Sequence, residues 1–441
     1  MPQHGCILSC SIVVCHAGVV AGTAFSRLNV HGNATWTPQR LAWSGVLMAW
    51  NELPQLTERW RAVGETLKQI CPHWQLGSSY EGWIAAQHRA SPRWVPLVVQ
   101  RLRELGNNLA RERPSPRFSR WKPLAVDGSL IACPRTQENQ QAMGDRGKPE
   151  GIPQLSLTML LHLEHGLPWD FRVGPGTESE RAHLRSMLDD LPCGSLLVAD
   201  AGFIGYELCR ELIDRRQPFL FRVGGNMHLL SELGCEVDVR DDIVYLWPVK
   251  QQNKNEPPIR LRLIVLREEG QQPIYLVTNV LDSVALTDAE ASEIYHARWD
   301  VEVEFRSLKQ TLPHAALRSR QPETCYLEMT WYVLGLWLLQ LMTAREVQTA
   351  GGDPHEISLS QARNCVRRVL RNQSPCPRTK RTLRHALGTC RQDNYERQRP
   401  KASRNYPRKK RHTPPGPPII KPPDALQLRK AQALTPLELR I

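Results

Sequence analysis

Two aspartates of this 441-residue chain directly follow short apolar runs that are typical of buried β-strands. Asp127 follows residues 123–126 and opens the sequence Asp-Gly-Ser, and Asp200 follows residues 195–199. Strand ends in an α/β sheet commonly present catalytic groups, because the sheet fixes the residue and the loop exposes it. Carboxylates are the oxygen ligands that hard divalent metal ions prefer. An Asp-Gly pair is also a common turn former, so each aspartate alone leaves both interpretations open.

A more specific pattern consists of four polar residues with separations of three, four and seven positions: Tyr295, Arg298, Glu302 and Lys309. At 100° per residue, these positions stay on one face of a helix. That face would carry a carboxylate flanked by two cations and a phenol, while Asp300 and Glu304 would point elsewhere. The alternative is an ordinary solvated pair between Arg298 and Glu302, since charged helices often carry such i,i+4 pairs.

The spacing Tyr-x2-Arg-x3-Glu-x6-Lys resembles the signature of insertion-sequence transposases of the "four" family, which have a DDE catalytic triad. Residues 124–129 (LAVDGS) resemble the first-aspartate strand of this family, and residues 197–203 (LVADAGF) resemble its second-aspartate motif. The order and the intervals also fit, and the resemblance covers about residues 120–345. It implies a ribonuclease H-like, mixed-sheet α/β core with a β-rich insertion at residues 218–285.

The resemblance implies that Asp127, Asp200 and Glu302 are catalytic and hold two Mg²⁺ or Mn²⁺ ions. Two such ions can activate the attacking oxygen of a phosphodiester reaction and stabilise the leaving one. Tyr295, Arg298 and Lys309 would hold the terminal phosphates of the element, since Arg and Lys suit phosphate contacts. Water-mediated nicking at the transposon end would come first, followed by attack of the freed 3′-OH on DNA.

Two neighbours of this motif have weaker interpretations. Trp299 could stack on a displaced base, but we expect it to be a core residue. Arg306 lies about 40° from the direction of Glu302 on a regular helix, which would allow one more phosphate contact.

The elements that must position these residues follow from the apolar patterning. Apolar and β-branched runs predict the strands of a mixed α/β sheet, at residues 123–126, 155–163, 195–199, 219–223, 243–246, 259–266 and 274–281. Helical spacing predicts helices, at residues 178–191, 205–215, 288–308 and 325–345. Residues 40–112 also read as helical, and they either contact DNA or form a plain helical bundle.

The chain has a net charge of +13, but its last 81 residues alone hold 21 Lys and Arg against 4 Asp and Glu. A basic region of this kind indicates an anionic polymer as partner, most often nucleic acid. Residues 373–441 are also rich in Pro, which predicts a disordered tail. Such a tail would add DNA affinity that is independent of sequence and weakens with salt, or it is merely solvated.

The cysteines and the N-terminus indicate an intracellular protein. There is no Cys-x2-Cys pair among the 12 cysteines, so reduced thiols in a cytosolic setting are the simplest interpretation. Residues 1–39 form an uncertain extension whose apolar run lacks the basic region of a signal peptide, which favours a dispensable segment or a misassigned start codon. Residues 331–342 are too short to span a bilayer and read as a buried helix.

The sequence therefore predicts a bacterial-type, cytoplasmic, nucleoid-associated DDE transposase with no membrane partner. Its catalytic domain would span residues 120–345, and its partners would be double-stranded DNA at the transposon ends and at the target. The resemblance implies a homodimer in the synaptic complex. Two alternatives remain: a nuclease of the same core that only hydrolyses, and a non-catalytic DNA-binding protein derived from a transposase.

Overall fold

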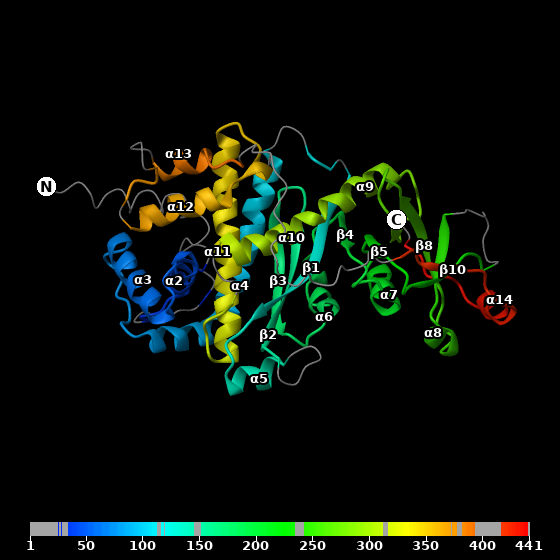
Figure 1. Ribbon diagram of the computed structural model, residues 1–441, viewed down its shortest axis with the longest axis horizontal. Helices are drawn as coiled ribbons and strands as arrows, with labels where there is room; N and C mark the ends of the chain where they lie inside the picture. Colours follow the sequence, from blue (N-terminus) through cyan, green and yellow to red (C-terminus); the bar gives the residue numbers. More distant parts are fainter. Residues whose placement is uncertain are drawn as a thin grey trace. The chain divides into compact units, whose positions relative to one another are not determined.

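A computed structural model describes residues 34–112, 116–118, 120–144, 151–233, 242–311, 316–371, 373–376, 382–392 and 416–439, together with Phe25 and Leu28. The chain forms two compact units. The helical unit comprises Met1–Arg117, Gly128–Ser179 and Asp300–Asn394, and the sheet unit comprises Phe118–Asp127, Glu180–Trp299 and Tyr395–Ile441. Figure 1 labels the elements of both. Apart from Phe25, Leu28 and residues 34–39, the predicted extension lies outside the described residues.

The helical unit is built around the long helix α11, Pro322–Thr349, drawn in yellow in Figure 1. Most of its residues are buried, including those of the apolar run 331–342, so the predicted core helix is confirmed. In the described part of the chain, no helix is both long and apolar enough to cross a membrane.

Close helix packing in this unit depends on small residues. A Cβ atom at Gly335 of α11 would lie 2.7 Å from Cβ of Ala49, so only glycine fits there. Ala49 belongs to α2, Pro38–Trp50, which starts with Thr37 as N-cap and a proline in the first turn. Trp50 of the same helix donates from Nε1 to the Gly335 carbonyl at 2.9 Å, which satisfies the buried indole.

Other helices complete the unit. They are α3 (Leu56–Ile70), α4 (Tyr80–Arg111), α5 (Gln137–Met143), α12 (Leu359–Leu370) and α13 (Leu383–Gly388), with the 3₁₀ turn η4 at Pro354–Glu356. Helices α2, α3 and α4 confirm the helical character expected for residues 40–112. Their contact with DNA stays a prediction.

Strand β1, Lys122–Ala132, is longer than the sequence predicted and continues through Asp127. The Asp-Gly pair does not turn the chain, since β1 continues beyond it into the helical unit. Ile131 is completely buried, and Ala132 forms a bridge with Ala316. In this unit β1 neighbours β2, Gln154–His162.

Strand β2 confirms the strand expected at residues 155–163, and it pairs antiparallel with β3, Leu167–Pro175. The sequence analysis missed β3, which contains Asp170, Arg172 and two prolines. Its buried Asp170 carboxylate is paired with Arg103 of α4 at 2.7 Å. This long-range ion pair offsets the cost of burying the charge of Asp170.

The sheet unit has the strand order β10-β6-β7-β8-β9-β5-β4-β1. Strand β4 (Ser195–Ala199) lies parallel between β1 and β5 (Phe219–Val223). The bounds of β4 and β5 agree with the predicted strands. The other strands are β6 (His228–Leu230), β7 (Ile243–Leu246), β8 (Ile259–Leu266) and β9 (Ile274–Thr278), with β8 and β9 antiparallel as expected for a hairpin. The helices are α6 (Glu180–Arg185), α7 (Tyr206–Asp214) and α8 (Val249–Asn253), with a 3₁₀ turn η2 at Leu188–Asp190.

This topology confirms the predicted fold class of a mixed α/β protein. Parallel strands β1, β4 and β5 carry the apolar runs, and the antiparallel β-rich insertion follows β5 in the chain. Tight burial of β4, whose five residues are all buried, fixes the position of the residue that follows it.

The prediction of disorder after residue 373 was wrong for two segments. Helix α13 forms at Leu383–Gly388, and residues 416–439 form β10 (Ile419–Lys421) and α14 (Ala425–Gln432). Strand β10 pairs in parallel with β6, and Asp424 and Gln427 form a capping box at the start of α14. The pairing with a strand far along the chain and the capping box outweigh the high Pro and charge content of the tail. Residues 393–415 lie outside the described residues.

Candidate active site

Asp127 and Asp200 lie next to each other in the sheet unit. The parallel register of β1 and β4 pairs Val126 with Ala199, so the next residue on each strand is one of the two aspartates. The residues before them are completely buried, whereas both aspartates are partly exposed. Oδ1 of Asp200 accepts a hydrogen bond from the Gly202 backbone N–H at 2.8 Å, which orients that carboxylate. The sheet thus presents two carboxylates at adjacent positions.

Helix α9, Asp288–Ala297, brings Tyr295 to the same unit. Tyr295 is buried, and the guanidinium of Arg298 lies 5.6 Å from the centre of its ring. Burial raises the pKa of the Tyr295 phenol, while Arg298 and Arg222 lower it and Asp200 raises it slightly. The two guanidinium groups and Asp200 are therefore close enough to act on the Tyr295 phenol.

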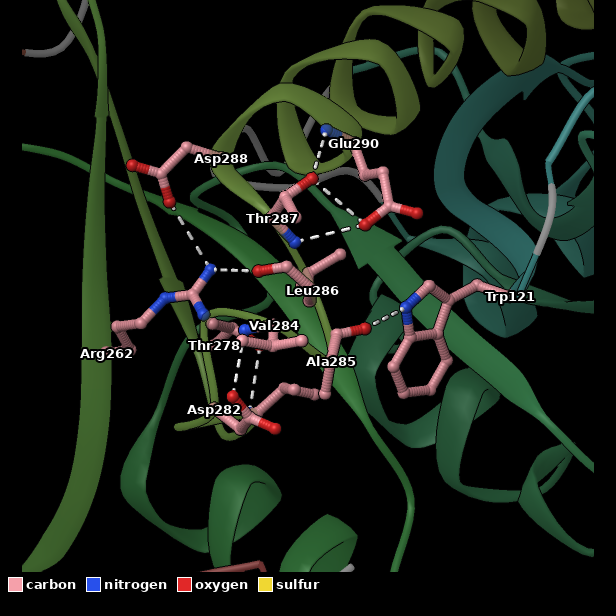
Figure 2. A network of polar contacts seen from close by, with 11 residues as sticks. Trp121, Arg262, Thr278, Asp282, Val284, Ala285, Leu286, Thr287, Asp288 and Glu290 are labelled. Carbon is pink, nitrogen blue, oxygen red and sulfur yellow. Dashed lines mark hydrogen bonds and ion pairs between the residues drawn. The ribbon is translucent and has the colours of Figure 1, made fainter.

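The start of α9 is held by a network of polar contacts, shown in Figure 2. Arg262 of β8 is almost completely buried, and it donates to the Leu286 carbonyl at 2.6 Å and pairs with Asp288 at 3.4 Å. Thr287 and Glu290 form a capping box on the first turn. Trp121, just before β1, donates from Nε1 to the Ala285 carbonyl at 3.0 Å. The helix that carries Tyr295 is thereby anchored to two strands.

Glu302 lies on α10, Trp299–Arg306, and is half-buried. Two residues further on, Glu304 is buried in the helical unit, where it accepts a hydrogen bond from Gln340 of α11. Burial raises the pKa of Glu304 to about 8. Asp300 pairs with Arg117 at 3.4 Å. These two acidic neighbours thus have structural partners of their own, in line with the expectation that they point elsewhere.

Lys309 lies in a π-helical turn, η3 at Ser307–Thr311, that follows α10. Its Nζ donates to Oγ of Ser129 at 2.6 Å. Ser129 is on β1, two residues after Asp127, and both partners of this bond belong to the helical unit. A cation of the sequence motif is therefore oriented by a hydroxyl group on the strand that carries the first aspartate.

The single helix expected from Tyr295 to Lys309 was wrong. Helix α9 ends at Ala297, Arg298 is its C-cap, and α10 begins at Trp299. The π turn has a wider i→i+5 hydrogen-bond pattern than an α-helix, so a constant 100° per residue does not apply to Lys309. Tyr295 and Arg298 belong to the sheet unit, while Glu302 and Lys309 belong to the helical unit.

Trp299 also corrects an expectation. We predicted a core residue, but its side chain is 53% exposed. Arg306 is exposed, as a phosphate contact would require.

Three further residues of the site were missed by the sequence analysis: Arg222, Ser129 and Arg262. Arg222 is the only charged residue in the apolar run of β5, and this isolated charge could have drawn attention to it. Ser129 and Arg262 act through contacts with residues far along the chain, which no local pattern reveals.

Asp127 and Asp200 are suitable ligands for a hard divalent ion, because each offers carboxylate oxygens from a fixed strand position. Within the described residues, no group of three or more His, Cys, Asp or Glu side chains is arranged to hold a metal. Glu302 belongs to the helical unit, so the sheet unit by itself supplies two of the three expected ligands.

Comparison with known proteins agrees with these features. Residues 122–338 match the family model of the transposase DDE domain. The IS4 transposase InsG of Escherichia coli (strain K12) is 24% identical over 301 residues, which is 65% of this chain and 66% of that protein. A probable transposase for IS5377 of Geobacillus stearothermophilus is 28% identical over 153 residues, or 32% of this chain and 39% of that one. The alignments thus span less than two thirds of these relatives.

Residues 122–338 therefore form a transposase DDE domain, and the resemblance to the "four" family is confirmed. Members of this family use divalent metal ions. A solved structure, the piggyBac transposase synaptic complex with hairpin DNA, matches 88% of this chain and 83% of that one with 10% identity. Its TM-score is 0.39.

Proposed function

We propose that this protein is the transposase of an insertion sequence, which cleaves DNA strands at the ends of the element and joins them to a target. The observation that carries this proposal is the pair of aspartates at adjacent positions of β1 and β4, inside the segment that matches the DDE domain. Glu302, on the helix that follows α9, is the third acidic residue.

In this proposal Asp127, Asp200 and Glu302 hold two Mg²⁺ or Mn²⁺ ions. Bound ions supply charge neutralisation at the scissile phosphate and activation of the attacking oxygen. The chain itself keeps the ligands in place through the buried strands before the two aspartates and through the Gly202 N–H that orients Asp200.

Cationic groups bind the phosphates on either side of the reacting one. Arg298 and Arg222 surround Tyr295 in the sheet unit, and Lys309 is oriented by Ser129 in the helical unit. Guanidinium groups bind phosphate oxygens with two parallel hydrogen bonds, whereas lysine acts as a point charge. Because burial raises the pKa of Tyr295, its hydroxyl stays protonated at neutral pH and can donate to a phosphate oxygen.

The proposed partners are double-stranded transposon ends and target DNA, bound by a homodimer in the synaptic complex. The basic region after residue 361 would increase affinity for any DNA, and this contribution would weaken as salt is raised. We place the protein in a bacterial cytoplasm, associated with the nucleoid and without a membrane partner.

The test uses the Glu302→Ala variant of the full chain and DNA that carries the ends of the element. We expect loss of strand cleavage, with binding to end DNA retained, because the methyl side chain of alanine cannot act as a metal ligand. Asp300→Asn is the matched control, since Asp300 lies about half a helical turn away and pairs with Arg117.

Cleavage by Glu302→Ala at the wild-type rate would contradict the proposal. Cleavage by the wild-type chain without any joined product would instead favour the hydrolytic nuclease. Binding without cleavage by the wild-type chain would favour the non-catalytic DNA-binding protein.

A further inference from the structure

Two thiol groups of the helical unit lie close together. Sγ of Cys365 on α12 and Sγ of Cys390, which follows α13, are 3.9 Å apart, although the residues are 25 positions apart in the chain. A disulfide needs about 2.0 Å between the sulfurs.

The two thiols differ in environment. Both thiols line one cavity, but Cys365 is half-buried whereas Cys390 is 2% exposed. The hydrogen bond with Cys390 lowers the pKa of Cys365, and the positive charge of Arg368 lowers it further against the effect of burial. The same hydrogen bond and burial raise the pKa of Cys390. Because its pKa is lowered and its side chain is less buried, Cys365 forms a thiolate more readily than Cys390, which is the second thiol of the pair.

The cavity that gives access to Cys365 has a volume of about 530 Å³ and an excess of positive charge. Arg367, Arg368 and Arg371 line it, with Glu52 as its acidic residue. Glu52 pairs with both Arg367 and Arg371, so this group, together with Arg368, carries an excess of two positive charges. Such a positively charged lining attracts a small reagent that bears carboxylates.

We propose that Cys365 and Cys390 form a redox-active dithiol, which a small anionic disulfide oxidises to an intramolecular disulfide. The Cys365 thiolate attacks one sulfur of the reagent, forms a mixed disulfide and expels one thiolate, which takes up a proton. Cys390 then loses its proton and attacks Sγ of Cys365, and the second reagent thiol leaves. The protein loses two electrons and two protons, and one reagent disulfide is reduced to two thiols.

The new bond would join α12 to the segment after α13, which already contact each other. Ser358, the N-cap of α12, donates from its backbone N–H to the Cys390 carbonyl at 2.9 Å, and Ile357 forms a bridge with Arg391. The backbone around the dithiol is thus fixed before oxidation, so the two sulfurs approach without a rearrangement of the helices.

The experiment treats the reduced full chain with glutathione disulfide and maps the cysteines by mass spectrometry of proteolytic peptides. We expect a Cys365–Cys390 cross-link that dithiothreitol removes. In Cys390→Ser the reaction should stop at glutathione on Cys365, and in Cys365→Ser modification of Cys390 should slow by about tenfold or more. Cys193→Ser, which removes an exposed thiol of the sheet unit, should react as the wild type.

Two further arms test the role of the cavity. Neutral hydroxyethyl disulfide should react more slowly than glutathione disulfide, and Arg368→Gln should reduce that difference. A cross-link of Cys365 to Cys376, which lines the same cavity, would overturn the assignment of the pair. A mixed disulfide on Cys365 that persists in the wild type would overturn the proposal as a whole. Strand cleavage is not part of the readout, so these outcomes are independent of the proposed transposase activity.

Discussion

The ammonium group of Lys309 donates a hydrogen bond of 2.6 Å to the hydroxyl of Ser129. Lys309 belongs to the Tyr-Arg-Glu-Lys motif, and Ser129 follows Asp127 by two residues on β1. The contact connects two sequence motifs that are 180 residues apart. It gives the lysine a defined direction, which matters for a point charge on a flexible side chain.

Removal of either partner should weaken the binding of end DNA. We expect Lys309→Ala to cost about 1–2 kcal/mol in binding and to reduce the salt dependence by about one phosphate contact. Ser129→Ala should have a smaller effect in the same direction, and the two changes should not be additive because they act on one contact. Fluorescence anisotropy at several salt concentrations measures both quantities. Lys250→Ala, an exposed lysine of α8, is the control, and an equal loss in that variant would contradict a specific role for Lys309.

Arg222 should contribute to the same reaction from β5. We expect Arg222→Ala to lower the rate of strand cleavage by about tenfold or more, since it removes a cation beside Tyr295. The pKa of Tyr295 should rise further in this variant, because Arg222 lowers it in the wild type. Single-turnover cleavage and an ultraviolet titration of the tyrosines measure the two effects. Arg267→Ala, at an exposed position after β8, should leave both unchanged.

Glu304 should make the stability of the protein depend on pH. Its pKa of about 8 in the folded protein lies above the ordinary glutamate value, so between about pH 4.5 and 8 the folded state binds more protons than the unfolded state. The free energy of unfolding should therefore fall as pH rises through this range, by at most about 1.4 kcal/mol for each unit of pKa shift.

Glu304→Gln removes this dependence, because a glutamine cannot ionise. The variant should match the wild type at pH 5 and exceed its stability at pH 9, as measured by urea unfolding. Glu293→Gln, an exposed position on α9, controls for the loss of one carboxylate. If the difference in free energy of unfolding between the wild type and Glu304→Gln were the same at pH 5 and at pH 9, the argument would be refuted.

Arg262 should be required for the anchoring of α9. We expect Arg262→Ala to reduce the free energy of unfolding by about 3–4 kcal/mol, because it leaves the Leu286 carbonyl and the Asp288 carboxylate without their buried partner. Chemical denaturation measures this loss. Arg260→Ala on the same strand removes a more exposed ion pair with Glu438 and should cost less than about 1 kcal/mol. Equal losses in the two variants would show that burial of Arg262 is not the cause.

Local patterns predicted those elements whose burial is complete and continuous. Strands β4 and β5 appear in the sequence as short apolar runs because both of their faces are covered. Strand β3 could not be found in this way, since its buried Asp170 depends on Arg103 of a distant helix. The same limit applies to α14, half of whose residues are polar, because its Gln427 and Lys430 contact Gln252 of α8 far along the chain.

The candidate site was predicted through the resemblance more than through geometry. The two aspartates and the Tyr-Arg-Glu-Lys spacing identified the family, but the assumed straight helix ignored the break at Arg298 and the π turn around Lys309. That assumption also placed Trp299 in the core, where the structure exposes it. Contacts such as Lys309–Ser129 require the tertiary structure, because their partners have no relation in local sequence.

The central claim is that Asp127 and Asp200 bind catalytic metal ions at adjacent strand positions. The most direct test replaces Asp200 with cysteine and follows strand cleavage of end DNA in Mg²⁺ and in Mn²⁺. A thiolate is a poor ligand for Mg²⁺ and a better one for softer ions. We predict at least a roughly hundredfold loss of cleavage in Mg²⁺, with partial recovery in Mn²⁺. Undiminished cleavage in Mg²⁺, or an equal loss with both metals, would contradict the account.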